Sequence, residues 1–184
     1  MARLRSPRAP VPLDSGRLEE LALRYVSRFA TTRAKLIAYL ARKLSERGWS
    51  GDCRPDPEGL AEKFSELGYV DDEAYALAKS RSLASRGYGK RRLEEKLRIA
   101  GVGDADSGLA REHAAAEAVE AAIRFAKRRR IGPFASGNAD PKQREKAIAA
   151  MVRAGHSFEL ARVIADMPTG VEVDMNELCE RFAK

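Results

Sequence analysis

The sequence predicts an all-α protein of three tandem three-helix repeats that form an elongated, curved modular array. Alanine, leucine, arginine, lysine and glutamate dominate the 184 residues, and all five favour helix. Apolar residues recur at helical spacing through most of the chain. Gly48, Gly101 and Gly155 each follow a predicted helix, and they are 53 and 54 residues apart. This fixed period indicates one helical unit that occurs three times.

The first repeat is expected at residues 17–68. The 16 residues before it contain three prolines and three arginines, which is typical of a disordered basic arm. Asp56 followed by Pro57 is typical of a helix N-terminus. Gly48 and Gly68 end helices, because glycine adopts the left-handed cap conformation without a Cβ clash. The expected helices lie near residues 17–29, 32–47 and 57–67.

The second repeat is expected at residues 69–111. The carboxylates of Asp71 and Asp72 can accept hydrogen bonds from the free N–H groups at the start of its first helix. Gly101 ends the second helix. Several glycines and aspartates follow, so the third helix should be short. The expected helices lie near residues 72–86, 90–100 and 104–110.

The third repeat is expected at residues 112–168, followed by a C-terminal tail at residues 169–184. Asp140 and Pro141 form another predicted helix start. Gly155 ends that helix, and we expect the neighbouring His156 to be a capping or surface residue rather than a metal ligand. The expected helices lie near residues 113–130, 141–154 and 157–167.

Basic and acidic segments alternate along the chain. Residues 79–98 contain eight basic and two acidic residues, and residues 124–130 contain five basic residues. One interpretation is solvated helix faces with internal salt bridges. However, cations at a helix start oppose the helix dipole, which favours an anionic partner instead. The candidate binding residues are Arg81, Arg86, Tyr88, Lys90, Arg91, Arg92, Lys127, Arg128, Arg129 and Arg130, with Gly87 and Gly89 forming a tight turn around Tyr88.

Motifs of enzymes and cofactor sites are missing from the sequence. There is no nucleotide-binding glycine loop, zinc-protease motif or nucleophile elbow, so we expect no catalytic residues, no metal and no cofactor. A divalent ion at Asp71 and Asp72 is an alternative to their capping role, which explains them without an ion. No 18-residue apolar stretch predicts a membrane span. Cys53 and Cys179 fit reduced thiols in a cytoplasmic protein.

Two adjoining motifs, GYVDDEAYA at residues 68–76 and RGYGKRRLEEKLRIAG at residues 86–101, resemble the middle repeat of the RecX family of bacterial recombination regulators. The resemblance extends more weakly from about Leu18 to Met167. The segment from Arg33 to Gly48 is about one helical turn longer than the family's usual spacing, and the helix after Gly101 is poorer.

We expect the protein to be a monomer, and this resemblance implies that it binds the RecA–DNA filament. There it would restrain ATP hydrolysis, strand exchange and co-protease activity in recombination and the SOS response. A general DNA-binding protein, whose basic clusters contact phosphates directly, is the alternative.

Overall fold

The computed structural model describes residues 11–137 and 140–182, and the chain divides into two compact units, Met1–Asp72 and Glu73–Lys184. The described residues form α-helices, two short 3-10 helices and one isolated β-bridge, which confirms the predicted all-α class. None of the described helices has the length and hydrophobicity needed to cross a membrane.

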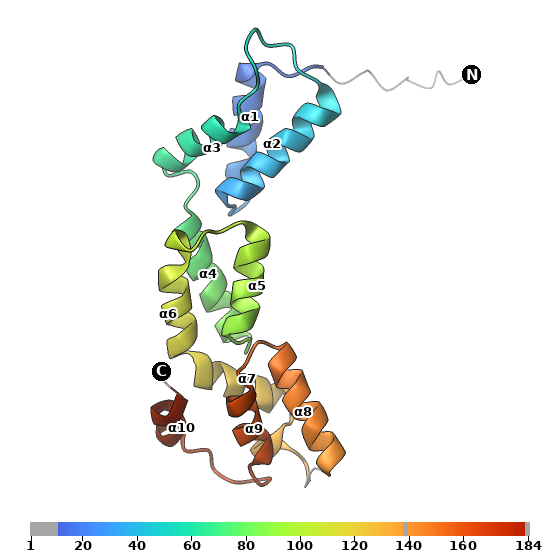
Figure 1. Ribbon diagram of the computed structural model, residues 1–184, viewed down its shortest axis with the longest axis vertical. Coiled ribbons are helices and arrows are strands. Elements are labelled where there is room, and N and C mark those ends of the chain that lie inside the picture. Colours follow the sequence, from blue (N-terminus) through green and yellow to red (C-terminus); the bar gives the residue numbers. More distant parts are fainter. Residues whose placement is uncertain (1–10, 138–139, 183–184) are drawn as a thin grey trace, which may run out of the picture. The chain divides into compact units, whose positions relative to one another are not determined.

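The first unit contains helices α1 (Ser15–Val26), α2 (Arg33–Arg47) and α3 (Pro57–Glu66), shown in blue to teal in Figure 1. Each helix begins at a residue whose side chain accepts a hydrogen bond from a backbone N–H inside the first turn. These residues are Asp14, Thr32 and Asp56. One apolar cluster joins the three helices, with buried members Leu13, Leu18, Ala22, Leu36, Leu40, Ala61, Phe64 and Val70.

The expected disordered arm at residues 1–16 is wrong for its last residues. Leu13 is fully buried in the apolar cluster. Its N–H donates to the carbonyl of Gly48 at 3.0 Å, and its carbonyl accepts from the N–H of Ser50 at 2.7 Å. Residues 1–10 of this arm lie outside the described residues. The burial of one leucine therefore holds the start of α1 on the unit.

Asp72 connects the end of the first unit to the start of α2. Its carboxylate accepts a hydrogen bond from the backbone N–H of Arg33 at 2.9 Å, and it lies 3.6 Å from the Nε of the same residue. Asp72 is 6% exposed, so this charge is held by the N-terminus of α2 and by the guanidinium together.

The second unit begins with α4 (Asp72–Ser85), α5 (Lys90–Ala100) and α6 (Gly108–Ala116), which surround a second apolar cluster. The cluster's buried members are Ala76, Leu83, Leu93, Leu97, Ala110 and Ala114. A short helix was expected near residues 104–110. Instead a 3-10 turn at Ala105–Ser107 leads into α6, which continues to Ala116.

A single helix at residues 113–130 was also predicted, and this is wrong. The chain leaves helical geometry at Glu117, with φ −83° and ψ 3°, between α6 and α7 (Ala118–Arg129). The two helices run in different directions (Figure 1). Neither glycine nor proline occurs at the break, so the sequence contains no stop signal. The expected boundary after residue 111 falls inside α6.

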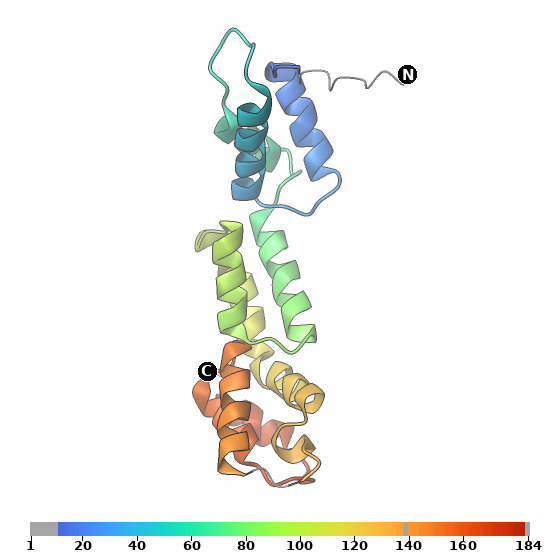
Figure 2. The same cartoon turned by 90° about the vertical axis from the view of Figure 1, so that its right-hand side faces the viewer.

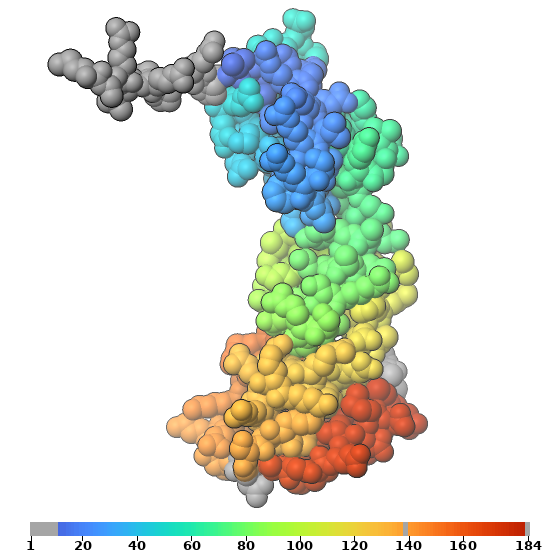
Figure 3. Space-filling model, turned by 180° about the vertical axis from the view of Figure 1, so that it is seen from behind, coloured from blue at the N-terminus to red at the C-terminus, as the bar shows by residue number. Residues whose placement is uncertain are grey.

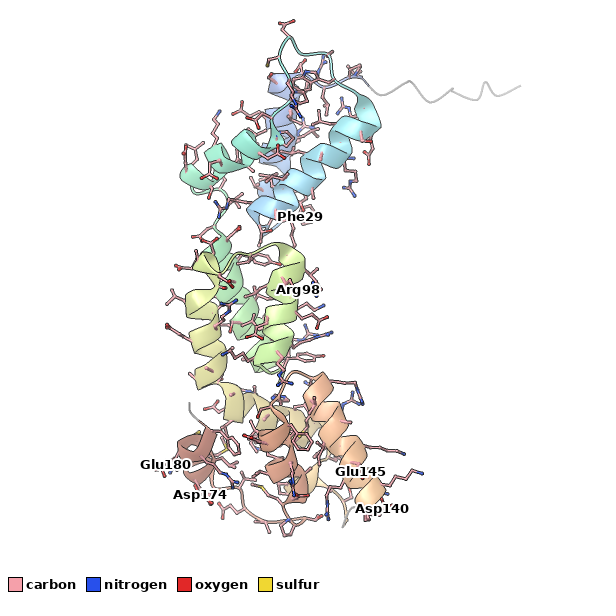
Figure 4. All side chains as sticks on the ribbon, in the orientation of Figure 1. Phe29, Arg98, Asp140, Glu145, Asp174 and Glu180 are labelled. Atoms are coloured by element: carbon pink, nitrogen blue, oxygen red, sulfur yellow. The ribbon has the colours of Figure 1, made fainter. Side chains whose placement is uncertain are left out.

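A third apolar cluster holds α7, α8 (Pro141–Arg153), α9 (Phe158–Asp166) and α10 (Met175–Phe182) together. The predicted tail contributes to it, because Leu178 of α10 is buried. Figure 4 shows Asp140 and Asp174 at the starts of α8 and α10, where both carboxylates accept backbone N–H groups. Three apolar clusters match the number of predicted repeats, and the equivalence of those repeats stays a prediction.

Two turns of the second unit meet backbone to backbone, and we call this contact the joint. It consists of Gly87–Gly89, between α4 and α5, and Ala154–His156, between α8 and α9. The N–H of Gly89 donates to the carbonyl of Ala154 at 3.0 Å, and that of Arg91 to Gly155 at 3.2 Å. Figure 2 shows the end of α8 (orange) next to the start of α5 (yellow-green).

Glycine is required on both sides of the joint. A Cβ at Gly89 would lie 2.3 Å from the carbonyl oxygen of Gly155, which is backbone and cannot rotate away. A Cβ at Gly155 would lie 2.5 Å from the backbone nitrogen of Arg92, and Gly155 also has φ +98°. The joint therefore has no room for a side chain at Gly89 or Gly155, and it sets how the second and third apolar clusters are placed in this unit.

His156 lies inside the joint, and its expected role as a capping or surface residue is wrong. It is 3% exposed, with its Nε2 3.1 Å from the carbonyl oxygen of Gly87 and its ring edge-on to Phe125. Burial lowers the pKa of His156 to about 4, while the hydrogen bond to Gly87 acts in the opposite direction. The ring is therefore neutral at pH 7, and Nε2 donates its proton to Gly87.

Gly89→Ala should destabilise the second unit by roughly 1–3 kcal/mol, because the added methyl overlaps a carbonyl oxygen. The measurement is chemical denaturation followed by circular dichroism. Gly108→Ala is the matched control, since a Cβ at Gly108 meets no atom within 4 Å and the residue lies at the start of α6. Equal stabilities of the two variants would contradict the close approach at Gly89.

His156→Gln should remove a pH dependence of stability. The unfolded state binds a proton below about pH 6.5, whereas the folded state does so only near pH 4. The wild type should therefore lose stability as the pH falls through this window, by up to roughly 3 kcal/mol. Glutamine can donate to Gly87 but does not titrate. Denaturation at pH 7 and pH 4.5 measures the effect, and equal losses in both proteins would show that His156 is not its source.

Candidate functional site

A pocket of about 560 Å³ opens beside the joint. Its residues come from the turn between α4 and α5, the first turn of α5, the last turns of α7 and the end of α8. Figure 3 shows α7 (gold) directly against the green segment that ends in this turn. The lining residues are Arg86, Tyr88, Arg92, Phe125, Arg128, Arg129, Ala150, Arg153 and Ala154.

Five arginines line this pocket, and no acidic residue does. Arg92 pairs with Glu95 at 2.6 Å, one turn further along α5. For the other four, no carboxylate of the described residues lies within ion-pair distance. Closely placed cations repel one another, so the pocket has a strong positive potential that an anion would relieve.

Two aromatic rings hold the guanidinium groups in place. The guanidinium of Arg128 lies 5.3 Å from the ring centre of Phe125 and 5.8 Å from that of Tyr88. It also donates to the backbone carbonyl of Arg86. Arg86 stacks on the Tyr88 ring at 5.5 Å. Such cation–π contacts reduce the mobility of the cations, so less entropy is lost when they bind an anion.

The helix dipoles explain only part of this basic cluster. Arg128 and Arg129 lie in the last turn of α7, where cations are favourable. Arg92 lies in the first turn of α5, where cations are unfavourable, and that helix begins at Gly89 without a side-chain cap. Most backbone N–H groups of this helix start already donate within the protein, those of Gly89 and Arg91 to Ala154 and Gly155. The basic side chains are therefore the groups that can attract an anion here.

The structure brings some of the predicted binding residues together and separates others. Arg86, Tyr88, Arg92, Arg128 and Arg129 share the pocket although they come from two segments of the sequence. The predicted residues outside it are Arg81, Lys90, Arg91, Lys127 and Arg130, all of them exposed.

Arg153 is a pocket residue that sequence reasoning missed. It is the last residue of α8 and is exposed beside the joint. A signal for it exists, since Lys146, Ala150 and Arg153 recur at helical spacing on α8.

The chemistry of this pocket is that of anion binding. Guanidinium groups donate hydrogen bonds and do not act as general bases at neutral pH. Among the described residues, no group of three or more histidine, cysteine, aspartate or glutamate side chains is placed to hold a metal ion. His113, the other histidine, lies 3.1 Å from the hydroxyl of Ser80, inside the packing of α4 and α6.

Comparison with known proteins gives related sequences. No family model matches the chain. The Regulatory protein RecX of Myxococcus xanthus (strain DK1622) is 32% identical over 177 residues, which cover 88% of this chain and 91% of the relative. That of Mycobacterium sp. (strain KMS) is 34% identical over 162 residues, covering 85% and 86%. That of Agrobacterium fabrum (strain C58) is 38% identical over 105 residues, covering 54% and 53%.

Solved structures have the same fold. A crystal structure of RecX from Lactobacillus salivarius superposes with a TM-score of 0.59 at 20% identity, covering 81% of this chain and 92% of that one. A second crystal structure, of a regulatory protein RecX, gives 0.58 at 21% identity, covering 82% and 71%. The helical fold agrees with these structures, and the Myxococcus relative is 32% identical across nearly the whole of both chains, so this chain belongs to the RecX family of regulatory proteins.

Proposed function

We propose that this protein binds the filament that RecA forms on DNA, through the arginine pocket beside the joint, and thereby inhibits RecA. Inhibition would extend to ATP hydrolysis, strand exchange and co-protease activity in recombination and the SOS response. The protein would act as a cytoplasmic, non-catalytic monomer. Family membership supports the partner, and the five arginines of the pocket support the place of contact.

The observation that supports this site most directly is its uncompensated charge. Arg86, Arg128 and Arg129 have exposed side chains, have no carboxylate partner among the described residues, and are stacked on aromatic rings. An arginine used only for solubility needs no such fixed position. Held in this way, the guanidinium groups can form bidentate hydrogen bonds to phosphates or carboxylates of the filament.

Two triple variants test the site. Arg86, Arg92 and Arg128 replaced together by glutamine remove three cations of the pocket. The second variant replaces Arg81, Lys90 and Arg91 by glutamine. It removes three cations that lie near Arg86 and Arg92 in the sequence but outside the pocket. The first variant should weaken filament binding and inhibition of RecA ATP hydrolysis by at least about tenfold, because each lost charge-assisted bond costs about 1.5–3 kcal/mol. The second should change both only a few-fold.

RecA ATP hydrolysis on single-stranded DNA, measured while each protein is titrated in, gives the comparison. Circular dichroism should show intact helices in both variants, since none of the six replaced residues belongs to an apolar cluster. Wild-type binding should also weaken as salt is added. If the pocket variant inhibits RecA like the wild type, the site is wrong. If the wild type binds bare DNA as tightly as it binds filaments, general DNA binding is the better description.

A further inference from the structure

A second pocket adjoins the first on the surface of the third apolar cluster. It has a volume of about 670 Å³ and shares Arg129, Ala150 and Arg153 with the first pocket. Because the two share these residues, they lie side by side, and we call the two pockets together the arginine groove. The second pocket adds basic side chains from the end of α7 and from α8, namely Arg130, Arg144 and Lys146.

The arginine groove is basic along its whole length. Eight basic side chains line it and no acidic side chain does. Only two of the eight form ion pairs with described carboxylates, Arg92 with Glu95 and Arg144 with Asp166 at 3.4 Å. The basic side chains are Arg86, Arg92, Arg128, Arg129, Arg130, Arg144, Lys146 and Arg153. A ligand with several linked negative charges would match this row of cations better than a single anion would.

One face of α8 supplies the floor between the cations. Gln143, Lys146, Ala150 and Arg153 recur at spacings of three and four, so they lie on one side of the helix. The remaining walls of the second pocket are mostly small, including Gly132, Ala135 and Ala147. A floor of small side chains allows a ligand's backbone to approach the cations closely.

These features decide between two kinds of polyanion. Protein partners usually bind through large apolar or aromatic anchors, whereas the arginine groove is lined mainly by cations and small side chains. Its most accessible ring, Tyr88, has the guanidinium groups of Arg86 and Arg128 over it. These guanidinium groups compete with a base for stacking on that ring. A row of guanidinium groups among small side chains suits phosphates.

We propose that the arginine groove binds the phosphodiester backbone of a single nucleic-acid strand without reading its bases. This rests on the proposed function, in which the strand is the DNA of the RecA filament. The phosphates lie along the cations from Arg86 to Lys146, and the bases point away from the floor. Binding is thus independent of sequence and depends on salt.

A matched pair of substitutions on α8 tests this proposal. Ala150 lies on the floor shared by both pockets, whereas its neighbour Ala149 is exposed and lines neither. Ala150→Glu places a carboxylate in the groove, and Ala149→Glu makes the same change of charge outside it. The full-length proteins are titrated into a fluorescent oligothymidine without RecA, and anisotropy is measured at several salt concentrations. Ala150→Glu should weaken binding at least about tenfold, and Ala149→Glu at most about twofold.

A second pair avoids the larger side chain, in case Ala150→Glu perturbs the helix. Lys146→Gln removes a groove cation, and Lys142→Gln removes an exposed one on the same helix outside both pockets. The wild-type plot of log affinity against log salt should have a slope of about −0.7 for each phosphate contacted. Lys146→Gln should make that slope less negative by about 0.7, and Lys142→Gln should leave it unchanged.

Several results would overturn the groove. One is equal weakening by Ala149→Glu and Ala150→Glu together with unchanged slopes for both lysine variants. A second is that polyglutamate of equal charge displaces the oligonucleotide as effectively as unlabelled oligonucleotide does. A third is a clear preference for duplex DNA over a single strand, and a fourth is strong discrimination between oligothymidine and a mixed-sequence strand. The proposed function fails separately, if the wild type binds the oligonucleotide but neither binds nor inhibits RecA filaments.

Discussion

The close approach of two backbones at Gly89 and Gly155 is the constraint on which the second unit depends. Because α5 begins at Lys90 and α8 ends at Arg153, a contact at this point fixes the ends of both helices at once. The contact is made by main-chain hydrogen bonds and a buried imidazole, so it does not use the side chains of the arginines around it. The pocket is therefore a product of the joint, which brings together cations from helices that pack on two different apolar clusters.

Much of the fold follows from local signals in the sequence. Capping residues such as Thr32, Asp56 and Asp140 and the periodic apolar residues locate most helices to within a few residues. The break at Glu117 was not predictable in this way, because residues 109–129 contain neither glycine nor proline and tertiary packing bends the chain there. The burial of Leu13 and Leu178 likewise depends on contacts far along the chain.

The candidate site was predictable in its parts but not as a whole. Charge runs identify Arg86 and Arg92 in one segment and Arg128 and Arg129 in another. Nothing local shows that these segments meet, since the contact that joins them is backbone to backbone at glycines. The same reason explains the error at His156. A polar residue after a helix-ending glycine is usually exposed, and here the opposing turn covers it.

The interactions of the pocket's arginines indicate that the fold does not depend on their charge. Repulsion among the arginines is offset by the C-terminus of α7 for Arg128 and by the rings of Tyr88 and Phe125. At the start of α5 no such compensation exists, and Arg92 depends on Glu95 alone among the described carboxylates. These cations lie outside the apolar clusters and contribute little to folding, so the fold does not require them. Their positions are fixed by the joint, whereas their charge is explained by the anionic ligand that we propose for them.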